Sequence, residues 1–454
     1  MTTPEIPAMR AGKRAPPKLD LRAFQGPAAP ASSAPLASDA ATALPRRRAY
    51  PRRLIDAHIH LWTKQQLDDG DMQWQRGSGG LDQLKGPHEL EAYAEVTDEA
   101  MALVGDGKSR HAGVIYVQAE ARRDDDDVDG SRGGWEAAIN EVESVCAAAL
   151  GADVHLLALV PWAPVQHGAA ALERYIPRLL ECPSLVALTE KLGYSPIKSF
   201  RYLLQDSPPG FFGTEQFIEG FRYLGERGYA FDMTLDVTHE QTGRTKILED
   251  AIDVIERVHR GQASEQQTRF IFDHFAKPSL TSDLSYPPPS HHTAYLETLF
   301  QLALVPHTYL KLSALLDSAD GPTAHAAFGE FKSGEYRKRS RRDSAYQRLK
   351  ARILAVLEPA IEAFGDERIL VGSDWPMFRA TLLPESVTSP SRAHCPTADP
   401  SEEARAWAFE MQLYLDCLVH LGLDGEALDR IFETNARKVY SLLPSPPLTN
   451  TAGT

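Results

Sequence analysis

The chain has 454 residues, of which 43% are hydrophobic and 24% charged, with a formal net charge of −14 at pH 7. This composition is typical of a globular protein with ample core material, and no run approaches the roughly 18 apolar residues of a membrane span. Residues 1–53 carry ten Lys and Arg against three acidic residues, which leaves a net charge of −21 on residues 54–454. Such an acidic body argues against a nucleic-acid partner.

The first 53 residues differ from the rest of the chain. They are rich in Ala, Pro and Ser and end in five arginines at 46–48 and 52–53, a composition that predicts a disordered N-terminal tail. An Arg-rich, acid-poor start also occurs in mitochondrial transit peptides, but the many prolines and the missing amphipathic period favour an extension of a cytoplasmic protein. The four cysteines show no CxxC spacing, which agrees with a reducing compartment.

From residue 54 onward, short aliphatic runs alternate with longer segments of helical period. Candidate strands are residues 53–60, 113–120, 155–160, 199–205, 230–237, 269–274, 309–314 and 368–374. Candidate helices between them include residues 135–150, 169–180, 214–228, 247–259, 295–304 and 346–364. Eight such strand–helix pairs predict an α/β fold, a (β/α)8 TIM barrel over residues 54–443 with loop insertions. Residues 444–454 are predicted to form a flexible C-terminal tail.

Two short motifs follow the first and last predicted strands. The first, DAHIH at 56–60, places His58 and His60 on one face of a strand, close enough for both imidazoles to bind one cation. The second, GSDWP at 372–376, places Asp374 at the end of the last strand. Its carboxylate could bind the same metal, accept a proton from the metal's water, or do both.

These motifs resemble those of the amidohydrolase-related (amidohydrolase 2) metal-dependent hydrolases of TIM-barrel fold, and within them the sugar-lactonase branch. The resemblance spans roughly residues 54–441. The matching segments are LIDAHIHLW (54–62), GVIYVQAE (113–120), FRYLLQDSPPGFF (200–212), FDMTLDV (231–237), RFIFDHFAKP (269–278), YLKLSALL (309–316), RILVGSDWPM (368–377) and IFETNARKVY (431–440). Related aromatic-acid decarboxylases more often carry Tyr-Pro-His where this chain has Trp-Pro-Met, which favours the lactonase branch.

The resemblance implies a metal site formed by His58, His60, His274 and Asp374, with Asp374 and His274 as catalytic residues. Imidazoles and a carboxylate suit one divalent ion, zinc or manganese, whose bound water has a pKa near 7 and could attack a lactone carbonyl. Some lactonases of this branch work without a metal, so direct catalysis by the same residues stays open. His239, shortly after the fifth strand, is either a further ligand or an ordinary loop histidine.

Polar residues at other strand ends are candidates for substrate contact. Arg201 could bind a substrate carboxylate or sugar oxygens, or could form an ion pair inside the barrel. Gln118 and Glu120 lie two residues apart on the second strand, so one of them could face the pocket. Glu120 could also reach the metal or fill a polar layer of the barrel.

Two more sets of residues flank the predicted metal motifs. Lys277 could contact substrate or orient Asp273, and Asp273 could hold the imidazole of a metal-binding histidine. Trp62 and Trp375 each follow one metal motif, and their rings could form apolar walls against a sugar ring or pack the barrel rim.

The sequence therefore predicts a hydrolase that opens the ring of a lactone, such as L-rhamnono- or L-fucono-lactone, with a water activated by metal and Asp374. The predicted partner is a small-molecule substrate, with neither nucleic acid nor membrane, and a homo-oligomer is one option. One alternative is a metal-dependent decarboxylase of an aromatic or unsaturated acid on the same scaffold. Another is a binding barrel without catalytic activity.

Overall fold

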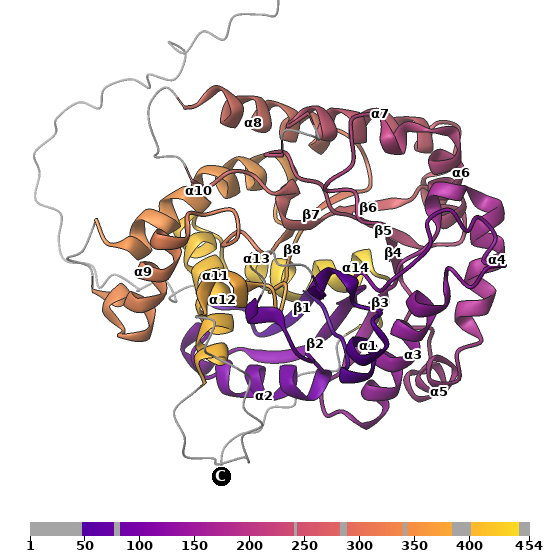
Figure 1. Ribbon diagram of the computed structural model, residues 1–454. Coiled ribbons are helices and arrows are strands. Elements are labelled where there is room, and N and C mark those ends of the chain that lie inside the picture. Colours follow the sequence, from indigo (N-terminus) through magenta and orange to yellow (C-terminus); the bar gives the residue numbers. More distant parts are fainter. Residues whose placement is uncertain are drawn as a thin grey trace, which may run out of the picture. The chain divides into compact units, whose positions relative to one another are not determined.

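The computed structural model describes residues 48–76, 82–239, 243–281, 288–338, 343–383 and 401–444 (Figure 1). Most of the predicted N-terminal tail, residues 1–47, and residues 445–454 of the predicted C-terminal tail lie outside the described residues. The last six residues of the predicted N-terminal tail, 48–53, do lie in the described part. There the Arg48 guanidinium forms an ion pair with Asp429, and the first strand begins at Arg53.

The described residues contain eight strands, each parallel to its neighbours. They are β1 (Arg53–Ile59), β2 (Arg110–Val117), β3 (Leu156–Val160), β4 (Ser199–Arg201), β5 (Ala230–Met233), β6 (Arg269–Phe272), β7 (Thr308–Leu312) and β8 (Ile369–Val371). Strands β1 to β3 pair in chain order, as do strands β4 to β8.

Short parallel bridges join these two groups of strands. Leu159 of β3 pairs with Ile197, which leads into β4, and Ile59 of β1 pairs with Trp375 beyond the end of β8. The sheet therefore closes on itself, and the predicted (β/α)8 TIM barrel is confirmed.

Helices surround the strands in Figure 1. They are α1 (Lys64–Asp69), α2 (Leu90–Ala100), α3 (Glu136–Gly151), α4 (Ala169–Leu180), α5 (Pro183–Leu192), α6 (Glu215–Glu226), α7 (Lys246–His259), α8 (Ser290–Ala303), α9 (Gly321–Lys332), α10 (Ala345–Phe364), α11 (Phe378–Leu382), α12 (Glu402–His420), α13 (Gly425–Asp429) and α14 (Asn435–Val439). The six predicted helices are all present. Five of them end within about two residues of the predicted bounds, because apolar period and capping residues such as Thr214 mark their limits. Helix α8 begins earlier than predicted, at Ser290.

The inside of the barrel is filled with side chains rather than open. Ile55, Ile115, Ile271 and Leu370 project into a buried apolar cluster that also includes Tyr440, just beyond α14. The segment around Tyr440 lies at the start of the strands, since the Arg269 side chain at the start of β6 donates a hydrogen bond to the Val439 carbonyl, at 2.9 Å. The N-terminal ends of the strands are thus covered, which leaves the C-terminal ends for a functional site.

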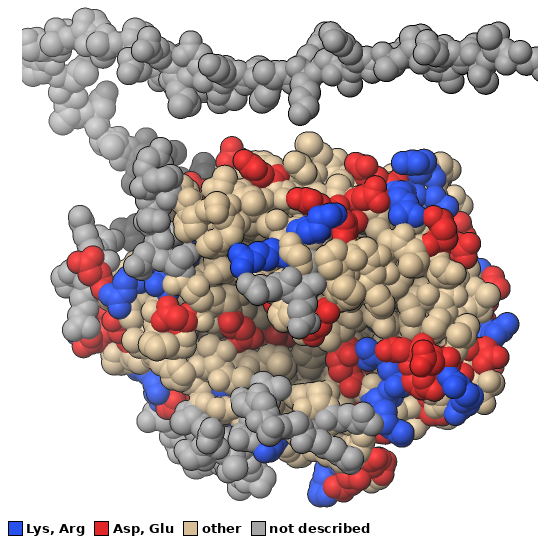
Figure 2. Space-filling model, turned by 45° about the horizontal axis from the view of Figure 1, so that its top comes forward, with Lys and Arg blue, Asp and Glu red and all other residues tan. Residues whose placement is uncertain are grey.

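Two observations concern a membrane and a nucleic acid as partners. Among the described residues, no helix has the length and apolar character that a membrane span requires. On the face shown in Figure 2, acidic and basic side chains of the described chain are intermingled, without a continuous basic area.

Candidate active site

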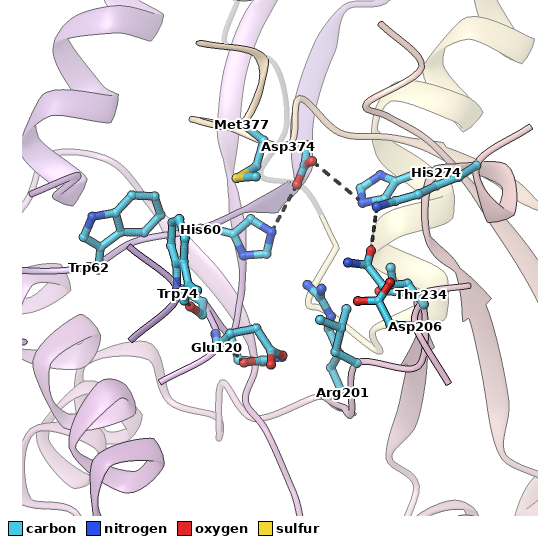
Figure 3. Close-up of a pocket in the computed structure, with 15 residues that line it drawn as sticks. His60, Trp62, Trp74, Glu120, Arg201, Asp206, Thr234, His274, Asp374 and Met377 are labelled. Atoms are coloured by element: carbon cyan, nitrogen blue, oxygen red, sulfur yellow. Dashed lines mark hydrogen bonds and ion pairs between the residues drawn. The ribbon is translucent and has the colours of Figure 1, made fainter. Parts of the chain in front are cut away.

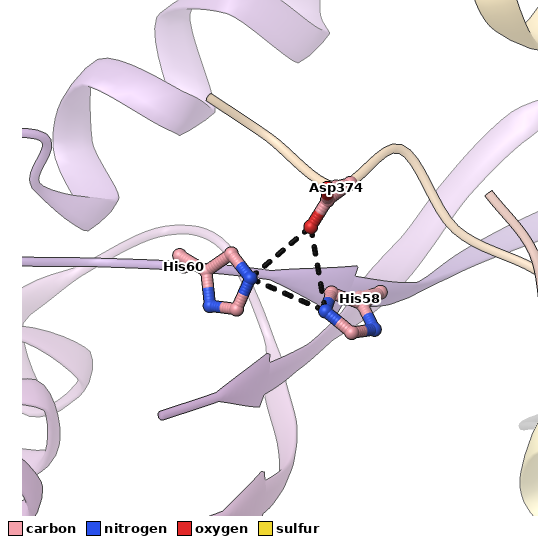
Figure 4. Close-up of side chains that lie close together, drawn as sticks. All are labelled: His58, His60 and Asp374. Carbon is pink, nitrogen blue, oxygen red and sulfur yellow. Dashed lines mark hydrogen bonds and ion pairs between the residues drawn. The ribbon is translucent and has the colours of Figure 1, made fainter. Parts of the chain in front are cut away.

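His58, His60 and Asp374 meet where β1 and β8 end (Figure 4). The Nε2 atoms of His58 and His60 are 3.2 Å apart. Oδ1 of Asp374 lies 3.3 Å from the first of these nitrogens and 3.1 Å from the second. All three side chains are buried, with relative exposures of 0%, 8% and 5%. Two histidines and one carboxylate from opposite ends of the chain thus form a tight triangle of possible ligand atoms.

The dimensions and chemistry of this triangle suit a divalent cation. Zinc binds imidazole nitrogen and carboxylate oxygen at about 2.0–2.2 Å in tetrahedral sites, in which two ligand atoms are about 3.3 Å apart. The three edges observed here, 3.1 to 3.3 Å, match that spacing. Oδ1 of Asp374 is buried and accepts no hydrogen bond within the described residues. The residues present therefore fit one metal ion with at least one further position for water or substrate.

The two imidazoles of the triangle are held differently. Nδ1 of His60 lies 2.9 Å from the Val117 carbonyl oxygen, to which it can donate, and this leaves a lone pair on Nε2 facing the triangle. Nδ1 of His58 instead faces Nζ of Lys311 at 3.0 Å and Oδ1 of Asp273 at 3.2 Å. Burial and the charge of Lys311 lower the pKa of His58 well below its ordinary value, so this imidazole is neutral at pH 7.

A buried polar network supports His58 from inside the barrel. Lys311 of β7 contacts Asp232 of β5, and its Nζ lies 3.1 Å from Oδ1 of Asp273. Asp232 also accepts a hydrogen bond from the hydroxyl of Tyr440 at 2.7 Å. Asp273 lies beside a histidine, in the place that the sequence suggested. Lys311, Asp232 and Tyr440 were not predicted for the site.

His274 stands next to the triangle rather than in it. Its Nε2 is 3.8 Å from Oδ2 of Asp374, the carboxylate oxygen that does not face the other two histidines. Its Nδ1 lies 2.8 Å from the hydroxyl of Ser313. Burial lowers the pKa of His274 to about 4. Burial tends to raise the pKa of Asp374, but the neighbouring histidines, His274 first, bring it below the ordinary value. At pH 7 a neutral imidazole therefore faces an ionised carboxylate.

Left-handed backbone occurs shortly after several strands, at the end of the barrel that carries the triangle. Glu120, His274, Ala314 and Asp374 have φ values of 61°, 54°, 49° and 55°. All four were predicted as the last residue of a strand, and the structure corrects this, because residues with positive φ cannot continue a strand. Such conformations are uncommon without glycine and concentrate at functional sites.

A cavity of about 350 Å³ opens at this end of the barrel (Figure 3). It is lined by His60, Trp62, Trp74, Gln118, Ala119, Glu120, Arg201, Leu203, Gln205, Asp206, Thr234, His274, Lys277, Asp374 and Met377. Figure 3 shows Trp62 and Trp74 on the side of His60, whereas His274 and Thr234 lie on the opposite side. The volume is that of a small-molecule site.

Four of the five predicted substrate-contact residues, Trp62, Gln118, Arg201 and Lys277, line this cavity. Trp375 does not. Its indole nitrogen donates to Oε1 of Glu403 at 2.8 Å, and its ring packs edge-on against Tyr93 and His88. The left-handed turn at Asp374 sends the following side chain behind the site, so Trp375 packs the barrel rim.

The sequence did not predict several residues of the cavity wall, which are Trp74, Ala119, Leu203, Gln205, Asp206, Thr234 and Met377. It also left the roles of Glu120 and His239 open. Trp74 donates from its indole to the Ala119 carbonyl at 3.0 Å; it lies in a short 3-10 helix, Gln73–Arg76, without a motif that could have marked it. Glu120 is held by Arg123, at 2.8 Å, and by Gln118. Neither Glu120 nor His239 belongs to the group of possible metal ligands found among the described residues.

A closed (β/α)8 barrel with a His/His/Asp triangle at the carboxyl ends of its strands defines a TIM-barrel enzyme with a candidate metal site. The chain belongs to the amidohydrolase family, whose sequence profile, described as Amidohydrolase, matches residues 55–442.

Comparison with individual proteins agrees with this family. The chain is similar to an L-rhamnono-gamma-lactonase of Scheffersomyces stipitis, with 22% identity over 407 residues that cover 86% of this chain and 99% of the relative. Its fold is similar to two crystal structures of an amidohydrolase from Burkholderia multivorans. One contains zinc (19% identity) and the other HEPES (18% identity); both have a TM-score of 0.53 and cover 86% of this chain and 99% of theirs. At such identities these structures show the shared fold.

Proposed function

We propose that this protein hydrolyses a lactone with a water molecule activated by Asp374 at a site for one divalent metal ion. The observation that carries the proposal is the triangle of His58 Nε2, His60 Nε2 and Asp374 Oδ1. It lies in a chain whose whole barrel aligns with a lactonase. Aldonolactones such as L-rhamnono- and L-fucono-lactone are the first substrates to test.

His58, His60 and Asp374 would hold the metal, with His274 beside them. Zinc or manganese, when bound there, supplies a Lewis acid that lowers the pKa of water and polarises a carbonyl. Asp374 is ionised at pH 7 and accepts the proton of the attacking water. The new bond joins the water oxygen to the lactone carbonyl carbon, the bond from that carbon to the ring oxygen breaks, and Asp374 returns the proton to the leaving alkoxide. The product is the open-chain hydroxy acid, and no covalent nucleophile takes part.

The cavity wall provides suitable contacts for a ring of monosaccharide size. Trp62, Trp74 and Met377 would cover its apolar face. Oδ2 of Asp374 and Nε2 of the neutral His274 lie 3.8 Å apart, and both residues line the cavity, so they would flank the lactone carbonyl. Gln118 and Lys277 are positioned to bind hydroxyl groups.

One contact favours a variant of this mechanism without metal. Lys311 Nζ lies within hydrogen-bond distance of His58 Nδ1, at 3.0 Å. If the ammonium donates there, His58 carries its own proton on Nε2 and points it at Asp374, 3.3 Å away. His58 would then orient the carboxylate directly, and Asp374 would activate water by itself.

The test combines elemental analysis of the purified protein with acid release from a panel of aldonolactones, before and after chelation. We expect near-stoichiometric metal, lactone hydrolysis that chelation abolishes, and a loss of at least about 10²-fold in kcat/KM for Asp374→Asn. The matched control is Asp320→Asn, which removes a carboxylate at the start of α9, away from the cavity. Hydrolysis that survives complete metal removal would refute the role of the metal. Absence of hydrolysis with every lactone, together with carbon dioxide release from an aromatic acid, would refute the proposed function.

A further inference from the structure

Arg201 is held rigidly at the end of β4. Its backbone N–H donates to the Pro161 carbonyl at 2.9 Å, and its own carbonyl accepts from the Ala163 N–H at 3.3 Å, so the residue is tied to the chain that follows β3. The residue is only 5% exposed. Figure 3 shows its guanidinium pointing into the cavity between His60 and Asp206.

Two of the three nitrogens of the guanidinium, Nε and Nη1, are buried without a hydrogen-bond partner within the described residues. Leaving a buried charged donor unsatisfied is costly, and native proteins normally pair such groups. An arginine with unpaired N–H donors in a cavity wall can bind an acceptor group of a ligand that enters the cavity.

The acidic residues around Arg201 are engaged elsewhere. Glu120 is paired with Arg123 at 2.8 Å. Asp273 accepts from the Thr234 hydroxyl at 2.6 Å and lies 3.1 Å from Lys311. Asp206 also lines the cavity but is exposed to solvent. Glu120 and Asp273 are near enough to interact with the charge of Arg201, but no described carboxylate forms a hydrogen bond or a close ion pair with it, although arginine binds carboxylates more strongly than neutral oxygens.

We propose that the substrate lactone carries a carboxylate group and that Arg201 binds it. The inference rests on the proposed lactonase function and narrows its substrate class to the lactones of dicarboxylic acids, such as sugar diacids. With the ring against Trp62 and Trp74 and the carbonyl near Asp374, the carboxylate reaches toward Arg201, which the view in Figure 3 places at the opposite end of the cavity from Asp374. The second cation of the wall, Lys277, is already held by the Gln205 side chain at 2.6 Å.

The test uses pairs of lactones that differ in one group. D-glucaro-1,4-lactone and D-glucono-1,4-lactone differ only in a carboxylate or hydroxymethyl group at C6, and the galactaro and galactono lactones form a second pair. We expect the wild type to prefer the acidic member of a pair by at least about 10-fold in kcat/KM. Arg201→Gln should lower that preference by about 10- to 100-fold, mainly through KM, because a charged hydrogen bond is lost. Arg201→Lys should retain part of the preference.

Two controls separate this effect from others. Lys277→Gln removes a cavity cation that is already hydrogen-bonded, so its effect on the preference should be smaller than that of Arg201→Gln. Thermal unfolding should show Arg201→Gln to be about as stable as the wild type, because two buried N–H donors without partners are removed. A clear loss of stability would instead show that Arg201 holds the barrel together, and would count against the inference.

The binding of the product acids keeps this test independent of turnover. Calorimetry should show glucarate or galactarate binding at least about 10-fold more tightly than gluconate or galactonate, a difference that Arg201→Gln removes. Equal binding of diacid and monoacid, or a preference unchanged in Arg201→Gln, would overturn the inference and leave the proposed hydrolysis intact. Selective diacid binding without hydrolysis of any lactone would support the Arg201 site and overturn the proposed reaction.

Discussion

Replacement of Lys311 by methionine tests how the barrel interior holds the site. The ammonium group is fully buried and contacts Asp232, Asp273 and Nδ1 of His58, the last at 3.0 Å. Its Nζ forms a hydrogen bond with Asp232 and an ion pair with Asp273. Nδ1 of His58 accepts a further N–H only in the variant without metal, in which the His58 proton lies on Nε2. Lys311→Met keeps most of the side-chain volume but leaves two buried carboxylates without their common cation.

The expected loss of stability is large. Removing one partner of a buried ion pair typically costs about 3–5 kcal/mol, because the remaining charge stays desolvated. The entropy of unfolding is about 2.1 cal/mol/K per residue, which gives roughly 0.8 kcal/mol/K for a barrel of about 400 residues. We therefore expect Tm to fall by roughly 4–6 °C. Asp232→Asn added to Lys311→Met should recover part of this loss of stability, since it removes one of the two buried carboxylate charges that Lys311→Met leaves without a cation.

Thermal unfolding followed by circular dichroism at pH 7 measures these changes. Lys332→Met is the matched control, because Lys332 forms a partly exposed ion pair with Glu402 at 2.8 Å, and such pairs are worth at most about 1 kcal/mol. If Lys311→Met unfolds at the temperature of the wild type, or if the double variant is less stable than the single one, the two carboxylates do not depend on Lys311 for charge compensation.

Two further predictions concern stability. Asp56→Ala removes a buried carboxylate that accepts a hydrogen bond from the Ser373 N–H at 2.7 Å across β1 and β8; urea denaturation should show a loss of about 3 kcal/mol or more, and a loss below 1 kcal/mol would contradict this role. Hydrogen bonds, first from Arg352, lower the pKa of Asp320 to about 2, so its ionised form stabilises the fold above its ordinary pKa near 4, and this contribution is lost as the pH falls through about 2. Asp320→Asn should thus lower the free energy of unfolding by less than about 1 kcal/mol at pH 7, because the carboxylate is one-third exposed. This difference in stability from the wild type should shrink between pH 4 and pH 2. A difference that stays constant over this range would exclude the ion pair with Arg352 as its source.

The sequence predicted those parts of the molecule that depend on local pattern. The alternation of apolar runs with helical segments located the eight strands, and the HxH spacing in the first strand correctly brought His58 and His60 together. Asp374 could be predicted to join them because it follows the last apolar run, and a closed parallel barrel brings all strand ends to one mouth. These predictions required the order of elements along the chain and the alternation of side chains, but no tertiary detail.

The parts that sequence reasoning missed depend on tertiary packing. A strand buried on both faces has no alternating pattern, so the sequence around Lys311 does not show that its ammonium points into the barrel. The partners Asp232 and Tyr440 lie 79 and 129 positions away and share no motif with Lys311. Because Trp375 adjoins Asp374, the sequence allowed it either in the cavity wall or in the barrel rim. The choice between the two depends on a left-handed turn that no glycine marks.

The triangle of His58, His60 and Asp374 spans the strand pair that closes the barrel. The Asp374 N–H donates to the His58 carbonyl at 2.8 Å, and the His60 N–H donates to the Trp375 carbonyl at 2.7 Å. Gly372 permits this close approach, since a Cβ atom at that position would lie only 2.8 Å from Cβ of His58. The two imidazoles and the carboxylate therefore come together only when the first and last strands pair. Closure of the barrel and assembly of the candidate metal site are accordingly one structural event, which explains why its ligands come from opposite ends of the chain.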